Sequence, residues 1–159
     1  MTDEEPVVEQ RGLWYEEMTV GTVYRHAPGR TIGEADNTLF SALTMNQQAL
    51  HVDEVFAREQ EFGARLVNSL MTLSMVVGLS VGQLTQHTLV ANLGFSDVTF
   101  PNPLFHGDTL YAQTLVTDKR LSRTRPHQGI VTLQHRGHNQ KDDLVVEATR
   151  TTLVRLEPR

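Results

Sequence analysis

The stretch SLMTLSMVVGLSVGQL, residues 69–84, decides the fold of this chain. Its apolar side chains recur at every angle around a helix, with only small or uncharged polar residues between them. A helix that is apolar all round is expected to be buried all round. The stretch is also shorter than the roughly 20 residues that cross a membrane comfortably. It therefore predicts a buried core helix rather than a membrane anchor.

The sequence that follows this helix has the pattern of a sheet. Segments rich in Val, Thr and Leu, separated by turns containing Pro, Gly and Asp, predict strands at about 88–100, 109–119, 128–139 and 144–155. An earlier strand is predicted near 20–28. Strands that gather after helices favour an α+β domain, so we predict one curved antiparallel β-sheet wrapped around the long central helix.

Helical signals precede the core helix. Thr31 and Glu34 have the spacing of a capping box, and the apolar residues after them recur at helical spacing to about residue 44. The chain then leaves this helix. Asn46 and His51 are predicted to lie on a loop and at the start of a short helix of about 53–59, and loops on a rigid scaffold often carry the chemistry of a protein.

Composition limits the function classes. The 159 residues fit one domain, which we assign to 13–159 after a solvated tail at 1–12. The chain has no cysteine, which excludes disulfides, thiolate zinc sites and a cysteine nucleophile. The acidic N-terminus is unlike a secretory signal, so we expect a cytoplasmic protein. The net charge of −5 argues against nucleic acid as a partner.

Two segments resemble the signatures of a known family. Residues 44–51 read TMNQQALH, and Asn68-Ser69 follow near the start of the core helix. They are similar to the Ser-Gly-Asp-x-Asn-Pro-Leu-His and His-Gly signatures of the MaoC-like hydratases, although only Leu50 and His51 are retained. Asn46 stands where that family has a carboxylate. Because an amide takes no proton at neutral pH, this departure puts the usual water-activating dyad in question.

Several further segments resemble one subgroup of that family, the MaoC-type proteins associated with CitE-like acyl-CoA lyases. They include DNTLF at 36–40, NLGF at 92–95 and FHGDTL at 105–110. The resemblance implies a hot-dog fold and a hydro-lyase that hydrates a branched dicarboxylic acyl-CoA, such as itaconyl-CoA or mesaconyl-CoA. It implies no cofactor, because coenzyme A is part of the substrate, and at least a homodimer with the acyl tunnel along the subunit boundary.

Hydration of an unsaturated thioester needs a base and a group that stabilises the enolate. His51 is the candidate base, because histidine is the usual proton carrier near neutral pH. Asn46 would orient the water, with Asp53 a distant second as a partner of the base. The backbone N–H of Ser69, and with it that of Leu70, would polarise the thioester carbonyl from the helix N-terminus. One base suffices if it returns the proton to the same face, which predicts syn addition.

Substrate-binding residues are assigned by charge and position. Arg65 and Asn68 are the candidates for a substrate carboxylate. Arg123 and Arg125 could bind the phosphates of coenzyme A, and solvated loop charges are an equally good interpretation of both arginines. Gly94, within the NLGF segment, is also assigned to substrate binding.

Several other motifs could indicate a serine hydrolase or a metal site, but each lacks a feature that such a site requires. GLSVG at 78–82 matches a serine nucleophile elbow but lies inside the helical stretch, without the strand and turn that this motif requires. The histidine pairs lack a third ligand with convincing spacing, so we expect no metal site. His135 and His138 should point to opposite faces of a strand. His26, His87 and His127 are expected to meet solvent.

Two other functions stay open. The chain could be a non-catalytic hot-dog module that binds acyl-CoA or supports a partner enzyme, with Asn46 marking lost chemistry and His51 a structural histidine. A hot-dog thioesterase would need a carboxylate on or near the long helix, and residues 66–84 contain no Asp or Glu. His106 is predicted either to cap the turn before a strand or to line the site behind the reacting groups.

Overall fold

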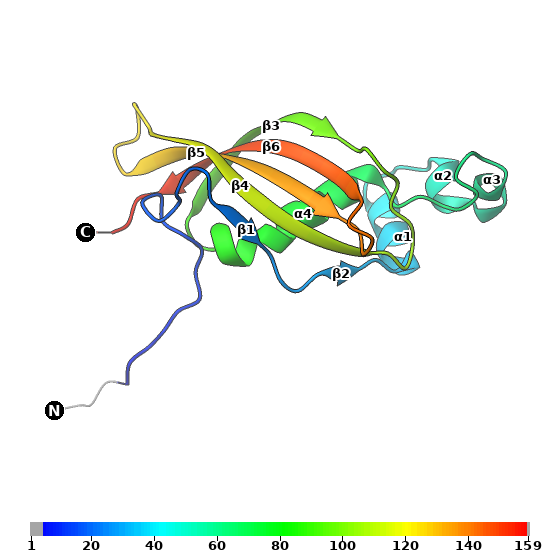
Figure 1. The fold of residues 1–159 in the computed structure, drawn as a ribbon, viewed down its shortest axis with the longest axis horizontal. Coiled ribbons are helices and arrows are strands. Elements are labelled where there is room, and N and C mark those ends of the chain that lie inside the picture. Colours follow the sequence, from blue (N-terminus) through cyan, green and yellow to red (C-terminus); the bar gives the residue numbers. More distant parts are fainter. Residues whose placement is uncertain (1–4, 159) are drawn as a thin grey trace.

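The computed structural model describes residues 5–158. In chain order its elements are β1 (Val23–Arg25), β2 (Arg30–Thr31), α1 (Glu34–Leu43), α2 (Ala49–Val52), α3 (Glu54–Arg58), α4 (Ser69–Leu84), β3 (Leu89–Thr99), β4 (Thr109–Leu121), β5 (Gln128–His138) and β6 (Leu144–Arg155). Figure 1 shows the long strands crossing α4 on one side, with α1, α2 and α3 together at one end of the molecule.

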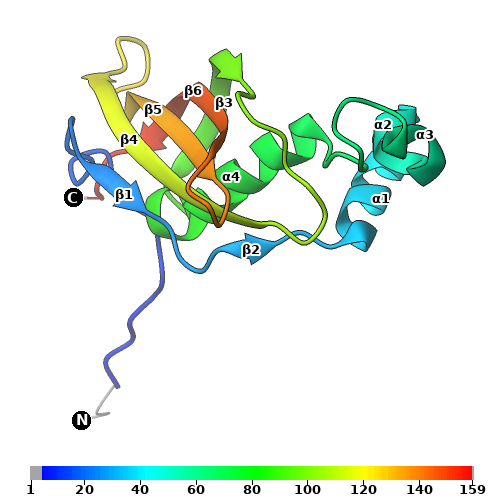
Figure 2. The same cartoon turned by 45° about the vertical axis from the view of Figure 1, so that its right-hand side comes forward.

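The strands form one antiparallel sheet in the order β1-β4-β5-β6-β3, with β2 also paired to β4. Figure 2 shows this sheet curving over α4. The predicted α+β architecture and its five strands are confirmed to within a few residues. The short strand β2 was not predicted, because two residues carry no alternation pattern.

The sheet packs closely on α4 because its inner positions alternate regularly. On β5 every second residue is buried, and Gly137 is one of them. A Cβ at Gly137 would lie 2.6 Å from Cγ2 of Val76 on α4 and 2.7 Å from Cγ1 of Val146 on β6. The absence of a side chain at this position therefore lets the helix and the sheet approach each other.

The prediction that α4 is buried all round is wrong for the single chain. Leu70, Ser74, Gly78 and Gly82 recur at helical spacing and are exposed, on the side of α4 that the sheet does not cover. A curved sheet covers only part of a helix surface, and an apolar sequence does not reveal which part is left open. None of the helices in residues 5–158 is long and apolar enough to cross a membrane.

The predicted capping box of α1 is also corrected. Thr31 belongs to β2, where its hydroxyl lies 2.7 Å from the hydroxyl of Thr109. The helix begins one residue after Gly33, and the Asp36 carboxylate accepts a hydrogen bond of 2.8 Å from the Gly33 N–H. The side chain that caps the helix N-terminus is therefore Asp36, in the first turn of the helix, and not Thr31 or Glu34 as predicted.

The short helix predicted at 53–59 corresponds to α3, and a separate helical turn, α2, precedes it. His51 lies on α2 rather than on a loop. Asp53 ends this turn and starts α3, because its side chain accepts a hydrogen bond of 3.0 Å from the Phe56 N–H. An Asp in this role is a strong helix N-cap, and here it lies between two helical turns.

Two histidines form a buried chain under α4, and one of them contradicts the sequence prediction. His26 is only 7% exposed, whereas we expected it to meet solvent. Its Nδ1 lies 2.8 Å from Oε1 of Gln83, and its Nε2 lies 2.8 Å from the hydroxyl of Thr114. The same hydroxyl lies 2.8 Å from Nδ1 of His135, which is fully buried. His138 lies on the other face of β5, as predicted, and His87 and His127 are exposed.

Candidate active site at the start of the central helix

Two segments that are distant in sequence meet where α4 begins. Leu66 and Phe105 form an antiparallel bridge, and the Val67 N–H donates a 2.8 Å hydrogen bond to the Leu104 carbonyl. The Leu66 N–H in turn donates to the Leu50 carbonyl at 3.0 Å. This pairing holds the chain around His51 and the turn before β4 against the N-terminus of α4.

The first turn of α4 presents a free backbone donor. Asn68 is the N-cap, and its Oδ1 accepts a 3.0 Å hydrogen bond from the Leu70 N–H. The Leu70 N–H is therefore committed to the cap. Among residues 5–158 no acceptor is bonded to the Ser69 N–H. The free donors of a helix N-terminus favour negative charge, so this N–H suits a thioester oxygen.

An apolar cavity of about 380 Å³ adjoins this donor. Ser69 and Thr72 line it from α4, together with Phe62, Leu66, Val67, Phe100, Pro101, Asn102, Pro103, Leu104 and Val145. Its position beside the helix N-terminus makes it a suitable pocket for a short acyl group, since small-molecule sites are mostly apolar with a few placed polar groups.

His51 is held in one tautomer. Its Nδ1 lies 3.0 Å from the Leu66 carbonyl oxygen, which can only accept, so Nδ1 carries the proton. In neutral His51 the lone pair is then on Nε2, and no residue within 5–158 is hydrogen bonded to this atom. The half-buried ring therefore presents an unoccupied proton acceptor, which is what a general base requires.

Asn46 stabilises the loop before His51. Its N–H donates to the Ser41 carbonyl at 2.9 Å, and its Oδ1 accepts from the Gln48 N–H at 3.1 Å. Within the described chain Asn46 makes no hydrogen bond to His51. Its predicted role in orienting water stays a prediction, because only its Nδ2 group is left for that role.

Arg65 is already paired in the folded chain. Its Nη2 lies 2.7 Å from Oε1 of Glu34, and its Nε lies 2.7 Å from Oε2 of Glu54. Hydrogen bonding to Arg65, and then to Arg58, holds the pKa of Glu54 below its usual value. The predicted contact of Arg65 with a substrate carboxylate stays a prediction, and these two carboxylates would compete with it. Asn68, in contrast, has a buried Nδ2 with no hydrogen-bond partner among the described residues.

The remaining predicted substrate-binding residues lie elsewhere in the single chain. Arg123 and Arg125 are in the turn between β4 and β5, at the end of the sheet away from α1 (Figure 1). The 13 residues of β4 that separate this turn from the site span about 40 Å. Gly94 lies on β3, the edge strand opposite β1. One chain therefore does not bring these residues to His51.

Sequence reasoning missed Asn37, and it left His106 without a definite role. Asn37 is fully buried on α1, and its Nδ2 lies 3.0 Å from Nε2 of His106. His106 is at the second position of a turn in which Gly107 has a φ of +90° and Asp108 accepts a 2.9 Å hydrogen bond from the Phe105 N–H. The Gly-Asp pair after His106 predicts such a turn, but not its neighbours.

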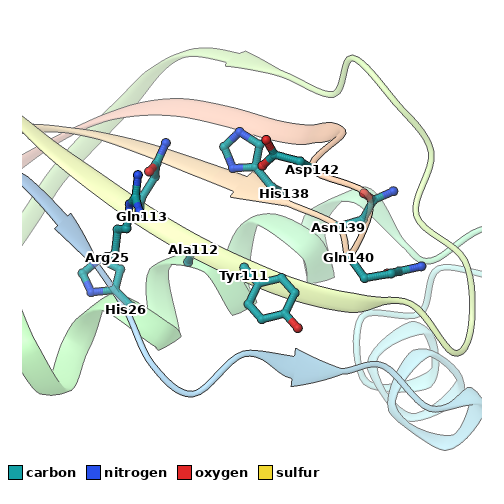
Figure 3. Close-up of a pocket in the computed structure, with 9 residues that line it drawn as sticks. All are labelled: Arg25, His26, Tyr111, Ala112, Gln113, His138, Asn139, Gln140 and Asp142. Carbon is teal, nitrogen blue, oxygen red and sulfur yellow. The ribbon is translucent and has the colours of Figure 1, made fainter.

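A separate cleft of about 720 Å³ lies along the sheet (Figure 3). Arg25 and His26 line it from the end of β1, and Tyr111 and Gln113 from β4. None of the predicted catalytic or substrate-binding residues lines this cleft. Across residues 5–158 no cluster of three or more metal-ligating side chains is present.

A sheet curved around one long helix, with a polar site at the helix N-terminus, defines the hot-dog class of α+β proteins. The chain belongs to the MaoC-like family, since the family model for the MaoC like domain matches residues 16–139. The MaoC-like dehydratase from Rhodospirillum rubrum has a similar structure, with a TM-score of 0.81 and 28% identity over 93% of this chain and 100% of that one.

Two curated relatives are named for their reactions. A mesaconyl-CoA hydratase from Cereibacter sphaeroides is 31% identical over 144 residues, which is 91% of this chain and 41% of the relative. A beta-methylmalyl-CoA dehydratase from Chloroflexus aurantiacus is 30% identical over 144 residues, 91% of this chain and 40% of the relative. The chain thus spans about two fifths of the length of these relatives.

Proposed function

We propose that the chain is a cofactor-independent hydro-lyase that adds water to a short, branched, dicarboxylic α,β-unsaturated acyl-CoA of the mesaconyl-CoA or itaconyl-CoA type. The observation that carries the proposal is the position of His51. Its Nδ1–H is fixed on the Leu66 carbonyl and its Nε2 is unoccupied, while Leu66 and Ser69 line the same cavity.

The chemistry needs only these groups. The thioester oxygen accepts a hydrogen bond from the Ser69 N–H. Nε2 of His51 takes a proton from water, and the hydroxide oxygen bonds to the β-carbon while the electron pair of the C=C bond moves to the thioester oxygen. The resulting enolate takes the same proton from Nε2 at its α-carbon, which regenerates the thioester and the neutral base. Because one base serves both steps, the two groups add to the same face.

The names of the relatives support the substrate class. Both the mesaconyl-CoA hydratase and the beta-methylmalyl-CoA dehydratase match over 91% of this chain. A thioesterase is disfavoured because α4 carries no carboxylate to activate a water or attack the thioester. The dicarboxylic acyl group is the finer part of the proposal, because it needs a donor for the second carboxylate.

A substrate panel tests this function. The purified protein is assayed with mesaconyl-CoA, itaconyl-CoA and crotonyl-CoA, following the loss of absorbance of the conjugated thioester. We expect turnover of a dicarboxylic substrate to exceed that of crotonyl-CoA. Release of free thiol without loss of the double bond would instead indicate a thioesterase, and no turnover of any substrate would favour a binding module.

We also propose that the chain forms a homodimer through β3. This strand is the edge of the sheet opposite β1, and it exposes Leu93, Phe95 and Val98. An exposed apolar edge strand readily pairs with another strand. The side of α4 that the sheet does not cover is exposed in the single chain, and a second copy would bury it. Light scattering after gel filtration should give the mass of two chains, and Phe95→Arg should shift it to one.

A further inference from the structure

The amide of Asn37 has only one possible orientation. Its Oδ1 accepts a 2.8 Å hydrogen bond from the Asn68 backbone N–H, which can only donate. Its Nδ2 faces the carbonyl oxygens of Leu66 at 3.2 Å and His51 at 3.3 Å, which can only accept. An exchange of the two amide atoms would leave the Asn68 N–H and the His51 carbonyl without this partner in a fully buried place, and it would set the amide oxygen against the Leu66 carbonyl oxygen.

This orientation determines the protonation of His106. Nε2 of His106 lies 3.0 Å from Nδ2 of Asn37, which is a donor, so Nε2 must be the acceptor. A proton on Nε2 would place two donors against each other. Burial lowers the pKa of His106, and the nearby Arg65 cation lowers it further, in agreement with a neutral ring. The proton of neutral His106 is therefore on Nδ1.

Nδ1 of His106 is available to a ligand. It makes no hydrogen bond within residues 5–158, and it is not among the polar side-chain atoms that are sealed from solvent without a partner. Asn37 connects the ring to the site, because its Nδ2 lies 3.0 Å from Nε2 of His106 and 3.3 Å from the His51 carbonyl oxygen. Its backbone is held rigidly, because Asp108 bonds the Phe105 N–H through Oδ2 and the Gln140 side chain through Oδ1.

We propose that neutral His106 is a substrate-binding donor whose Nδ1–H binds the free carboxylate of the dicarboxylic acyl group. The inference rests on the proposed function and deepens it. The Ser69 N–H is assigned to the thioester oxygen and His51 to water, and the unpartnered Nδ2 of Asn68 is sealed from solvent, so the second carboxylate still lacks an accessible donor. Arg65 carries two carboxylates already. A neutral donor can bind a carboxylate through a charge-assisted hydrogen bond without placing another cation beside the base.

The protonation state can be measured without any turnover. In the protein labelled with ¹⁵N-histidine at neutral pH, His106 should show a protonated Nδ1 and an unprotonated Nε2. Its Nδ1 resonance should shift when mesaconyl-CoA is added, and it should shift much less with crotonyl-CoA, which has no free carboxylate. A protonated Nε2, or equal shifts with both ligands, would overturn the proposal.

Two variants separate the two nitrogens of the ring. In His106→Asn the amide occupies the place of Nδ1 and keeps a donor there. In His106→Gln the amide reaches the place of Nε2, where it can accept from Asn37 but leaves no donor at Nδ1. We expect His106→Gln to lower kcat/KM for mesaconyl-CoA about 10- to 100-fold and to leave that for crotonyl-CoA within about threefold. His106→Asn should retain more of the mesaconyl-CoA activity than His106→Gln.

The outcomes distinguish this inference from the proposed function. If both substrates lose activity equally in His106→Gln, or neither does, the carboxylate assignment is wrong while the hydratase function stands. If the wild type hydrates no substrate, the proposed function fails, and the ligand-induced shift of Nδ1 still decides whether His106 binds the carboxylate. Thermal unfolding of both variants shows whether an activity loss reflects misfolding.

Discussion

At the scale of single residues, a few buried polar contacts fix the chemistry of the site. The Leu66 carbonyl determines the tautomer of His51. Backbone groups also determine the orientation of the Asn37 amide, and this amide in turn determines the tautomer of His106. The sequence motifs predicted that His51 and Ser69 belong to one site. They could not predict Asn37, because a single Asn on an amphipathic helix is usually a solvated residue, and its burial depends on a segment 31 residues later.

Replacement of Asn37 by Ala should destabilise the fold strongly. The change leaves the buried N–H of Asn68 without an acceptor and the Leu66 carbonyl without this donor. We expect the free energy of unfolding to fall by about 2–4 kcal/mol. Urea unfolding measures the change, with Thr38→Ala on the exposed side of the same helix as the control. A loss below about 0.5 kcal/mol would show that Asn37 does not connect these segments.

At the scale of elements, composition and turn residues made the strands predictable, whereas the bounds of the helices depend on single side-chain caps and were harder to predict. The four long strands were placed within a few residues, because each is rich in Val, Thr and Leu and is separated from the next by turn residues. The division between α2 and α3 depends on one Asp cap, and the start of α1 depends on one carboxylate. Such contacts outweigh the weak periodicity of short helices.

Packing between α4 and the sheet predicts a steric effect at Gly137. In Gly137→Ala the new methyl group would lie 2.6 Å from Val76 and 2.7 Å from Val146, so one side must move. We expect a loss of about 1–3 kcal/mol in the free energy of unfolding. Gly94→Ala on β3 is the matched control, since no atom lies within 4 Å of a Cβ there. Equal stability of the two variants would contradict the close approach of α4 to β5.

At the scale of the whole molecule, the fold could be predicted from the sequence, but the surfaces that stay exposed could not. An apolar helix before several strands indicated a sheet around a core helix, and the structure confirms it. Which helix face and which strand edge stay open could not be predicted, because that depends on how far the sheet curves around α4. The buried chain of His26, Thr114 and His135 was also hidden, because its members come from the residue after β1, from β4 and from β5.

This buried chain makes stability depend on pH. Burial lowers the pKa of His135 to about 3. Below about pH 6.5 the unfolded state binds a proton that folded His135 does not, so stability should fall with pH from about 6.5 towards 3, by at most about 1.4 kcal/mol per pH unit for this proton. Urea unfolding at pH 7, 6 and 5 should show this slope, and His135→Asn should reduce it. An unchanged slope in that variant would assign the effect to other groups.

His51 is the group on which the proposed hydration depends, so its removal is the most direct test. In His51→Ala no base removes the proton from water, and no group returns it to the α-carbon. General acid–base catalysis typically increases the rate by about 10²- to 10⁴-fold. His87→Ala, at an exposed histidine beyond the C-terminal end of α4, is the control. With mesaconyl-CoA we predict that kcat falls by at least about 100-fold in His51→Ala and is unchanged in His87→Ala. An undiminished kcat in folded His51→Ala would contradict the account.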